Sequence, residues 1–534
     1  MLLRFLLLFS CGLSVLAQDV RQDQLFERIF QQEQRFIQFL NTQAPLVETY
    51  IQEIQPSTSQ DVWRPSGDHY YLGRAKFVST VDYMPLVEDK ATSDTPRSAR
   101  RKNKPLTFLP RGFVQMAVLD LREFNSKHYH LEYVRREFLG DLRTLVFETT
   151  PLQRESGRFT GRIWVEEASA AIVRFNGTYL PTEPRKRSTQ LYFHFDSWRS
   201  SPTPGVWVPT RVYIEEQTEQ TSIGTRFKAQ TRFWNYASAQ ASMIDELTQV
   251  LVEQTSQVTD HSAAQDFTPF ESQRAWERQA EENVLARLEK SGLLAPPGPV
   301  DKILDTVVNN LIISGNLNVD AHCRVLLTTP LETFSIGHTI VISRGLIDVL
   351  PDEASLALAL ADELAHIALG HRTPTQFSFT NQTMLNDAEL LSHLRLERSR
   401  QEMNEAGAKT IEIMRASPYQ KSVSAGLFLK ALVSRAAILP RLLRANVGNQ
   451  VANTTSLHRL AEFMDAAPEL EENKLEQIAA LPLGSRIKLN PWNDQISLLP
   501  TKPVSLISTR EKIPFEIAPI FEYLTLAPAA EAPH

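Results

Sequence analysis

The residues best suited to chemistry lie in one short stretch, Ala-Asp-Glu-Leu-Ala-His, at positions 361 to 366. Asp362 and His366 are four residues apart, so on a helix their side chains share one face and could bind one metal ion. Glu363 follows Asp362 directly and could take a proton from a metal-bound water, as the general base of a hydrolase. We therefore consider zinc as a cofactor, with Glu363 as the candidate catalytic residue.

The stretch differs by one residue from the zinc-binding pattern His-Glu-x-x-His, because Asp362 stands where the first histidine is expected. A carboxylate reaches less far than an imidazole and adds a negative charge, which would lower the Lewis acidity of a bound zinc ion. The sequence thus predicts a weaker metal site and a poorer catalyst than an intact motif would give. A buried helix that carries these residues without a metal is the alternative.

The residues around the motif extend the pattern. Thr339–Ser343 reads as a strand, Gly345 and Leu346 as a turn, and His371 follows the motif as a further histidine. Over residues 300 to 447 the chain resembles the HtpX and CAAX prenyl protease group of zinc metallopeptidases, the gluzincins of metallopeptidase family forty-eight. The resemblance implies a mainly α metallopeptidase domain with a peptide-binding groove, in which the first zinc ligand has been replaced.

The resemblance also implies a third metal ligand, a glutamate on a downstream helix. Glu402 and Glu405 are both candidates, with Glu402 preferred, and neither restores the family's complete Glu-x-x-Ala-Asp pattern. His371 lies about 140° around an ideal helix from His366 and should not share its metal face. His338 begins the strand against which a substrate would pair in active relatives. We expect both histidines beside the cleft.

A different kind of pattern occupies the region from about 70 to 237. Six segments alternate apolar and polar residues and are rich in β-branched and aromatic side chains, which predicts consecutive antiparallel strands in a curved sheet or half barrel. The order of these strands resembles that of periplasmic lipoprotein-carrier-like sheets, which hold apolar ligands in their concavity. We interpret five aromatic residues as core rather than as a lipid groove: Trp164, Phe193, Phe195, Trp198 and Trp207.

The N-terminus predicts the compartment. A basic start, an apolar run from 5 to 16 and a cleavage site at Val15-Leu-Ala17 are typical of a signal peptide over residues 1–17, so we expect a secreted, periplasmic protein. Lipidation at Cys11 is the less favoured alternative. After cleavage Cys323 is the only cysteine, which excludes an intrachain disulfide.

The whole chain predicts an α+β protein. Of its 534 residues, 42% are hydrophobic and 22% are charged, enough for sizeable cores, and a net charge of −6 does not favour nucleic acid as a partner. Pro45 should divide the first helix, which we expect over Asp23–Ile54. The expected parts are a signal peptide (1–17), a helical segment (18–60), an antiparallel β domain (61–245), a helix with a Pro-rich linker (246–300), a metallopeptidase-like domain (301–450), a C-terminal helix and hairpin (451–526) and a disordered tail (527–534).

Three functions compete. The preferred one is a cell-envelope protein of the metallopeptidase family with impaired or lost catalysis, which binds extended polypeptide along the exposed strand Thr339–Ser343. The second is an active zinc metalloendopeptidase with Asp362, His366 and one of the two glutamates as ligands. The third is a periplasmic carrier or sensor that binds an apolar ligand in the β domain. Peripheral contact with a membrane and the oligomeric state are left open.

Overall fold

The computed structural model describes most of the chain. The predicted signal peptide, Cys11 and the predicted tail lie outside the described residues. Within the described residues, no helix is both long enough and apolar enough to cross a membrane. The described ranges are 23–56, 63–86, 108–181, 193–216, 226–236, 269–371, 398–443, 449–450, 458–471, 474, 476–484, 486–499, 515–519 and 521–526.

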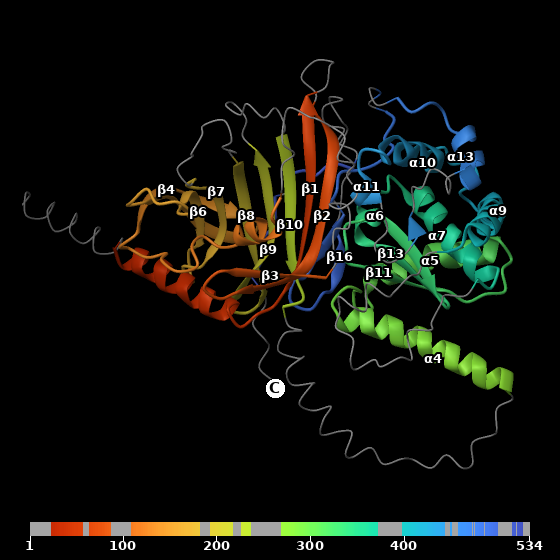
Figure 1. Cartoon of the computed structure of the whole chain (residues 1–534), viewed down its shortest axis with the longest axis horizontal. Helices are drawn as coiled ribbons and strands as arrows, with labels where there is room; N and C mark the ends of the chain where they lie inside the picture. The colour runs from red at the N-terminus through yellow and green to blue at the C-terminus, as the bar shows by residue number, and fades with distance from the viewer. Residues whose placement is uncertain are drawn as a thin grey trace, which may run out of the picture.

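A ten-stranded antiparallel sheet forms one side of the molecule (Figure 1). Its strand order is β3-β2-β1-β10-β9-β8-β7-β6-β5-β4, so every pair of adjacent strands is consecutive in sequence except β1 and β10, and β3 and β4 form the two edges. The antiparallel β domain and six of its strands are therefore confirmed. The strands are β1 (Leu46–Pro56), β2 (Trp63–Phe77), β3 (Val81–Pro85), β4 (Tyr129–Leu139), β5 (Leu142–Pro151), β6 (Phe159–Glu166), β7 (Ile172–Tyr179), β8 (Phe193–Thr203), β9 (Val206–Glu216) and β10 (Arg226–Trp234).

The first helix is shorter than the sequence predicted. It covers residues 23–40, and the segment expected as its second half is β1, an interior strand of the sheet. Pro45 precedes this strand and cannot continue a helix. Val47 and Ile51 are β-branched and favour a strand, which is why the predicted helix over Asp23–Ile54 is wrong in its second part.

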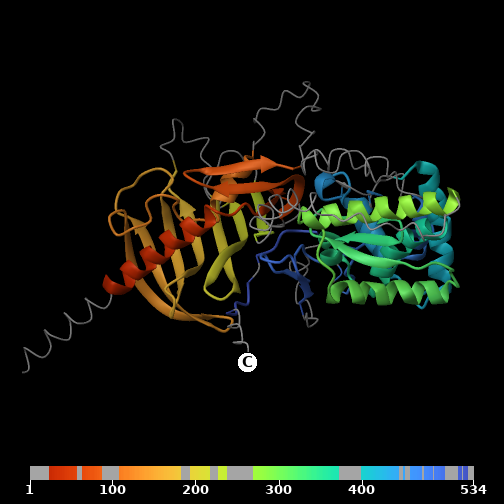
Figure 2. The same ribbon diagram turned by 90° about the horizontal axis from the view of Figure 1, so that it is seen from below.

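The two faces of the sheet have different neighbours. Helix 23–40 crosses the inner face (Figure 2), where α2 (Pro110–Gln115) also packs. Successive residues of a strand point to opposite faces, so Val47 and Ile51 join this inner core while Leu46 and Tyr50 face the other way. The outer face is covered at the β1–β2–β10 end by the second half of the chain, and at the β5–β8 end by residues 521–526 through Leu524.

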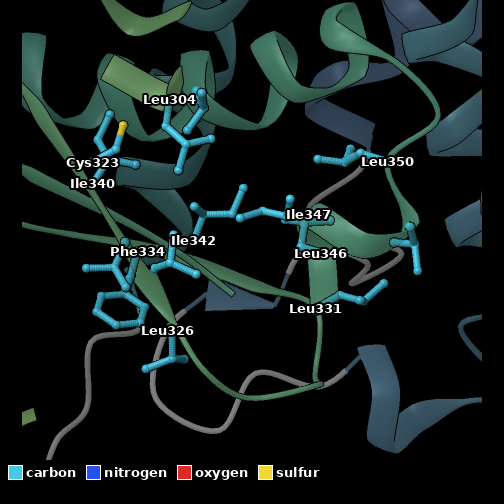
Figure 3. Packing of buried hydrophobic residues seen from close by; sticks show 14 of the residues in the cluster. Leu304, Cys323, Leu326, Leu331, Phe334, Ile340, Ile342, Leu346, Ile347 and Leu350 are labelled. Carbon is cyan, nitrogen blue, oxygen red and sulfur yellow. The ribbon is translucent and has the colours of Figure 1, made fainter. Parts of the chain in front are cut away.

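The second half of the chain forms a helical block around a small sheet with strand order β11-β13-β12-β14. Apolar residues of this sheet and of the surrounding helices share one core (Figure 3). We call this part the helical block. Its elements are α5 (Pro299–Ser314), β11 (His322–Leu326), β12 (Glu332–Ile336), β13 (Thr339–Ser343), α6 (Arg344–Val349), α7 (Glu353–Ala368), α9 (Arg400–Ala416), α10 (Ser424–Arg435), α11 (Pro440–Leu443) and β14 (Asn449–Gln450).

The remaining elements flank the helical block. The predicted C-terminal hairpin is confirmed, since β15 and β16 pair antiparallel. The predicted helix before it is present as η3 and α13, which pack beside α9 and α10. Their bounds are α4 (Pro269–Lys290), η3 (His458–Leu460), α13 (Ala461–Ala466), β15 (Ile487–Leu489) and β16 (Ile496–Leu498).

A buried carboxylate joins the sheet to the helical block. Glu48 of β1 accepts hydrogen bonds from Tyr70 Oη at 3.0 Å, from Thr329 N at 2.5 Å and from Thr329 Oγ1 at 2.6 Å. Arg344, the first residue of α6, donates from Nη2 to Glu48 Oε2 at 2.8 Å and from Nε to the Leu327 carbonyl at 2.9 Å. Both charged side chains are almost fully excluded from water, so each depends on the other for compensation.

Replacing Arg344 with methionine tests this junction. The change leaves the Glu48 carboxylate buried without its cation, and we expect the free energy of unfolding to fall by about 3–5 kcal/mol. Urea denaturation followed by tryptophan fluorescence measures the loss. Arg324→Met is the matched control, because the Arg324–Glu289 pair is much more exposed and should contribute about 1 kcal/mol or less. Equal losses in the two variants would contradict the role given to Glu48.

Candidate functional site

The predicted motif helix is present as α7. Asp352 caps its N-terminus by accepting from Ser355 N at 2.9 Å, and Ala and Leu residues on its buried side attach it to the core of the helical block. His366 is fully buried and Asp362 is largely buried. The one-turn spacing thus places both side chains inside the helical block, as the sequence predicted.

Asp362, which was expected to bind a metal, instead forms an ion pair with an arginine. The Arg459 guanidinium of η3 binds both oxygens of Asp362 through its two terminal nitrogens, and Thr410 Oγ1 donates to Asp362 Oδ1 at 3.2 Å. Burial alone would raise the pKa of Asp362, but the contact with Arg459 outweighs it and lowers that pKa below its ordinary value. Asp362 is therefore an ionised partner of Arg459.

The other predicted site residues have separate roles. Glu363 is fully buried and accepts a hydrogen bond from Thr333 Oγ1 at 2.9 Å. The Nδ1 atoms of His366 and His371 lie 2.9 Å apart, and His371 Nε2 lies 3.2 Å from Glu405 Oε2. The structure thus brings His366, His371 and Glu405 into one chain of contacts, which runs from the buried helix to the surface.

Two of the predicted residues do not join this group. Glu402 caps its own helix, α9, by accepting from Ser399 N at 2.9 Å and from Ser399 Oγ at 2.9 Å. His338 is exposed, and its Nδ1 lies 2.7 Å from the Asp320 carbonyl. Neither side chain is directed by these contacts toward Asp362.

These residues do not fit a zinc ion. Among the described residues, no group of three or more His, Cys, Asp or Glu side chains is arranged to hold a metal. The guanidinium of Arg459 lies beside Asp362, where a metal cation was expected. A zinc ion and Arg459 could not both bind the Asp362 carboxylate without strong repulsion between the two cations. The predicted resemblance to zinc metallopeptidases, with its hydrolase chemistry and gluzincin-type centre, is therefore wrong.

The predicted polypeptide-binding edge is also absent. Strand β13 pairs with β11 on one side and with β12 on the other, so its backbone groups are already used within the small sheet. Extended peptides add to a sheet through unpaired edge groups, which an interior strand does not offer. The prediction that Thr339–Ser343 forms an exposed binding strand is wrong for this reason.

A second charged site lies inside the β part and was missed by the sequence analysis. Arg199 of β8 donates from Nη1 and Nη2 to the two oxygens of Glu33 on helix 23–40, both at 2.7 Å. Each side chain is only 1% exposed. The pair links the helix to the inner face of the sheet, and the two residues are 166 positions apart, too far for any spacing rule to connect them.

The surroundings of this ion pair are apolar. The Arg199 guanidinium carbon lies 3.7 Å from the centre of the Phe36 ring and 5.5 Å from that of Phe175, within cation–π range. Arg199 also donates to the Ile172 carbonyl at 3.2 Å, while its buried Nε has no partner. The helix side of this apolar layer consists of Ile29, Phe30, Phe36, Ile37 and Leu40, and the sheet side includes Phe147, Phe159, Ile163, Phe175 and Phe195.

Comparison with known proteins gives one group of structural similarities. No family model matches the chain, and no curated protein matches it. A LolA superfamily protein from Nitrosomonas europaea is 14% identical, with 38% of this chain and 91% of that chain covered and a TM-score of 0.21. A lipoprotein-sorting protein domain of the outer membrane from Vibrio parahaemolyticus is 10% identical, with 38% and 93% covered and a TM-score of 0.21.

A third solved structure of this group is MucB of Pseudomonas aeruginosa in complex with MucA. It is 10% identical to this chain, with 38% of this chain and 93% of that chain covered and a TM-score of 0.11. The similarity extends over little more than a third of this chain in each case. At these scores it assigns neither fold nor function, so the interpretation rests on the contacts described above.

Breaking the Asp362–Arg459 pair tests its structural role. We expect Arg459→Met to lower the free energy of unfolding by about 3 kcal/mol, because a largely buried carboxylate loses its cation. The double variant Asp362→Leu with Arg459→Met should recover most of this loss. Arg415→Met is the control, since the exposed Arg415–Glu462 pair joins the neighbouring elements α9 and α13 and should contribute about 1 kcal/mol or less.

The same pair predicts a dependence on pH. Because the folded pKa of Asp362 is lowered, its contribution to stability is present above the ordinary carboxyl pKa and is lost as the pH falls through the folded value. The difference in stability between the wild type and Asp362→Asn should therefore shrink below about pH 4. Denaturation at a series of pH values measures it, and a difference that grows toward low pH would contradict the pairing.

Proposed function

We propose that this protein is an exported carrier or sensor that binds an apolar ligand between helix 23–40 and the inner face of the ten-stranded sheet. The observation that supports this proposal best is the buried Glu33–Arg199 pair, which joins the helix to an otherwise apolar sheet face. A helix that only completed a core would be expected to use apolar contacts alone, because such residues give equal or greater stability.

The lining of this layer determines the class of ligand. The inner face presents aromatic and branched aliphatic side chains from strands at both ends of the sheet, and helix 23–40 covers them. Apolar surface of this kind binds hydrocarbon chains through the hydrophobic effect, at about 25 cal/mol per Å² of buried area. An acyl chain or a molecule of similar shape would replace the contacts that Phe36 and Ile37 make in the closed arrangement.

The ion pair allows helix 23–40 to separate from the inner face of the sheet. When the helix leaves the sheet, Glu33 and Arg199 regain their hydration, which offsets most of the attraction that they lose. The pair therefore fixes the position of the helix on the sheet without adding much to the free energy of closure. Purely apolar contacts would not be compensated in this way, since their exposure to water is unfavourable.

Export is part of the proposal. The signal peptide predicted at residues 1–17 supports it, although these residues lie outside the described part of the chain. Cys323 is buried in the helical block, and its burial raises the pKa of the thiol, so the thiolate that oxidants attack is disfavoured. A single protected thiol suits an oxidising compartment.

Ligand binding can be measured directly with the chain from Gln18 onward and the dansyl derivative of undecanoic acid. We expect saturable binding with an increase in dansyl fluorescence, and competition by unlabelled fatty acid. Glu33→Gln should bind the probe about tenfold or more tightly, because weakening the closed state raises the fraction of binding-competent molecules. Circular dichroism verifies that the variant is folded.

Two further variants make the test specific. Asp196→Asn is the matched control, because the Asp196–Arg174 pair is also bidentate but lies on the outer face of the sheet, so its loss should leave binding unchanged. Glu33→Leu with Arg199→Met should close the helix by apolar contacts and weaken binding. No saturable binding by the wild type, or equal effects of Glu33→Gln and Asp196→Asn, would contradict the proposal.

A further inference from the structure

A third arginine, Arg232 of β10, lies between the sheet and the helical block. It is 5% exposed and sits on the outer face, directly opposite Glu48 of β1 and Arg211 of β9. Arg211 forms an ion pair with Glu522 at 3.3 Å, and Glu48 forms one with Arg344 at 2.8 Å. Arg232 thus lies beside two further arginines, and the carboxylates of Glu48, Glu522 and Asp348 lie around the three of them.

Arg232 has no carboxylate partner among the described residues. Its one hydrogen bond runs from Nη2 to Gln230 Oε1 at 3.3 Å, and its buried Nε has no partner. Glu48 is its nearest acidic neighbour in the sheet, but both oxygens of Glu48 are already engaged by Tyr70, Thr329 and Arg344. Arg232 therefore forms no direct ion pair among the described residues, although Glu48 and Asp348 attract its charge from further away.

A buried arginine cannot resolve this by losing its proton. Burial is the largest influence on Arg232 and lowers the pKa of its guanidinium. Arg344 and Arg211 act in the same direction, whereas Asp348 and Glu48 raise that pKa. The ordinary pKa of arginine is so high that the group nevertheless keeps its charge near neutral pH. Buried N–H groups without a partner cost free energy, which a bound anion would offset.

Two further donors lie on the residues around Arg232. Gln230 is on the same face of β10, and its Nε2 is buried without a hydrogen-bond partner. Arg344 belongs to the facing helical block, and its Nη1 is also buried without a hydrogen-bond partner, with the nearest oxygen of Asp348 at 3.8 Å. Buried donors of this kind are rare in native proteins, and here three occur on contacting or neighbouring residues.

We propose that Arg232 and Gln230, with Arg344 on the opposite wall, form a binding site for a small oxyanion of the phosphate or carboxylate class. The guanidinium fork presents parallel N–H groups that match two oxygens of such an anion, and the Gln230 amide supplies a further donor. The bound anion accepts hydrogen bonds from these buried donors and gives Arg232 a direct ionic partner. The site lies on the opposite face of the sheet from helix 23–40 and does not depend on the proposed carrier function.

Anion-dependent stability tests the site. The chain from Gln18 onward is exchanged into a buffer without oxyanions, and its unfolding midpoint is measured with phosphate, acetate or chloride added at equal ionic strength. We expect the midpoint of the wild type to rise with the logarithm of the concentration of phosphate or acetate, and to respond little to chloride. The stronger of the two oxyanion responses identifies the class. Equilibrium dialysis with radiolabelled phosphate then gives the stoichiometry if phosphate is the stronger.

Variants assign the effect to Arg232. Arg232→Met should remove the oxyanion-dependent rise of the midpoint, because it removes the guanidinium that would bind the anion. Gln230→Leu keeps the charge and should bind about tenfold more weakly. Arg162→Met is the control, since Arg162 forms an exposed pair with Glu148 and should leave the response unchanged. A wild type that does not respond, or an Arg232→Met variant that responds like the wild type, would overturn the proposal.

Discussion

The buried contact between Glu48 and Arg344 is the constraint on which the rest of the structure depends. Glu48 projects from β1, an interior strand of the sheet, and its two oxygens bind Tyr70 of the sheet, Thr329 of the helical block and the first residue of α6. The close approach at this point needs Gly345, because a Cβ there would lie 1.7 Å from the Thr329 carbonyl oxygen. The outer face of the sheet is thereby fixed to the helical block.

This attachment divides the possible roles of the two faces. The outer face is attached to the helical block through a continuous core and through buried hydrogen bonds, including those that Asp68 accepts from Arg441 N and Leu442 N of α11, so the block gives the sheet a rigid support. The inner face is covered by helix 23–40, which a short connection joins to β1. Besides the sheet, this helix contacts the C-terminal hairpin region through the stacked rings of Phe39 and Trp492.

Local patterns in the sequence predicted local structure, and they failed where the partners are distant. Alternation located six strands of the sheet, and the spacing of Asp362 and His366 correctly predicted one helix face. The chemistry of that face depends on Arg459, which lies 97 positions further along and follows no motif. The Glu33–Arg199 pair likewise joins residues from two elements that only the folded chain brings together. The mistaken helix over β1 arose because Leu46, Tyr50 and Ile54 also fit a helical repeat, and because a strand buried on both faces shows little alternation of apolar and polar residues.

The central claim is that helix 23–40 opens for a ligand while the helical block does not take part. Hydrogen–deuterium exchange of the chain from Gln18 onward, with and without a saturating fatty acid, tests this most directly. The account predicts that amides of residues 23–40 exchange faster when the ligand is bound, that the inner strands are protected, and that α7 is unchanged. Unchanged exchange in residues 23–40, with ligand-dependent changes confined to α7 and α9, would contradict it.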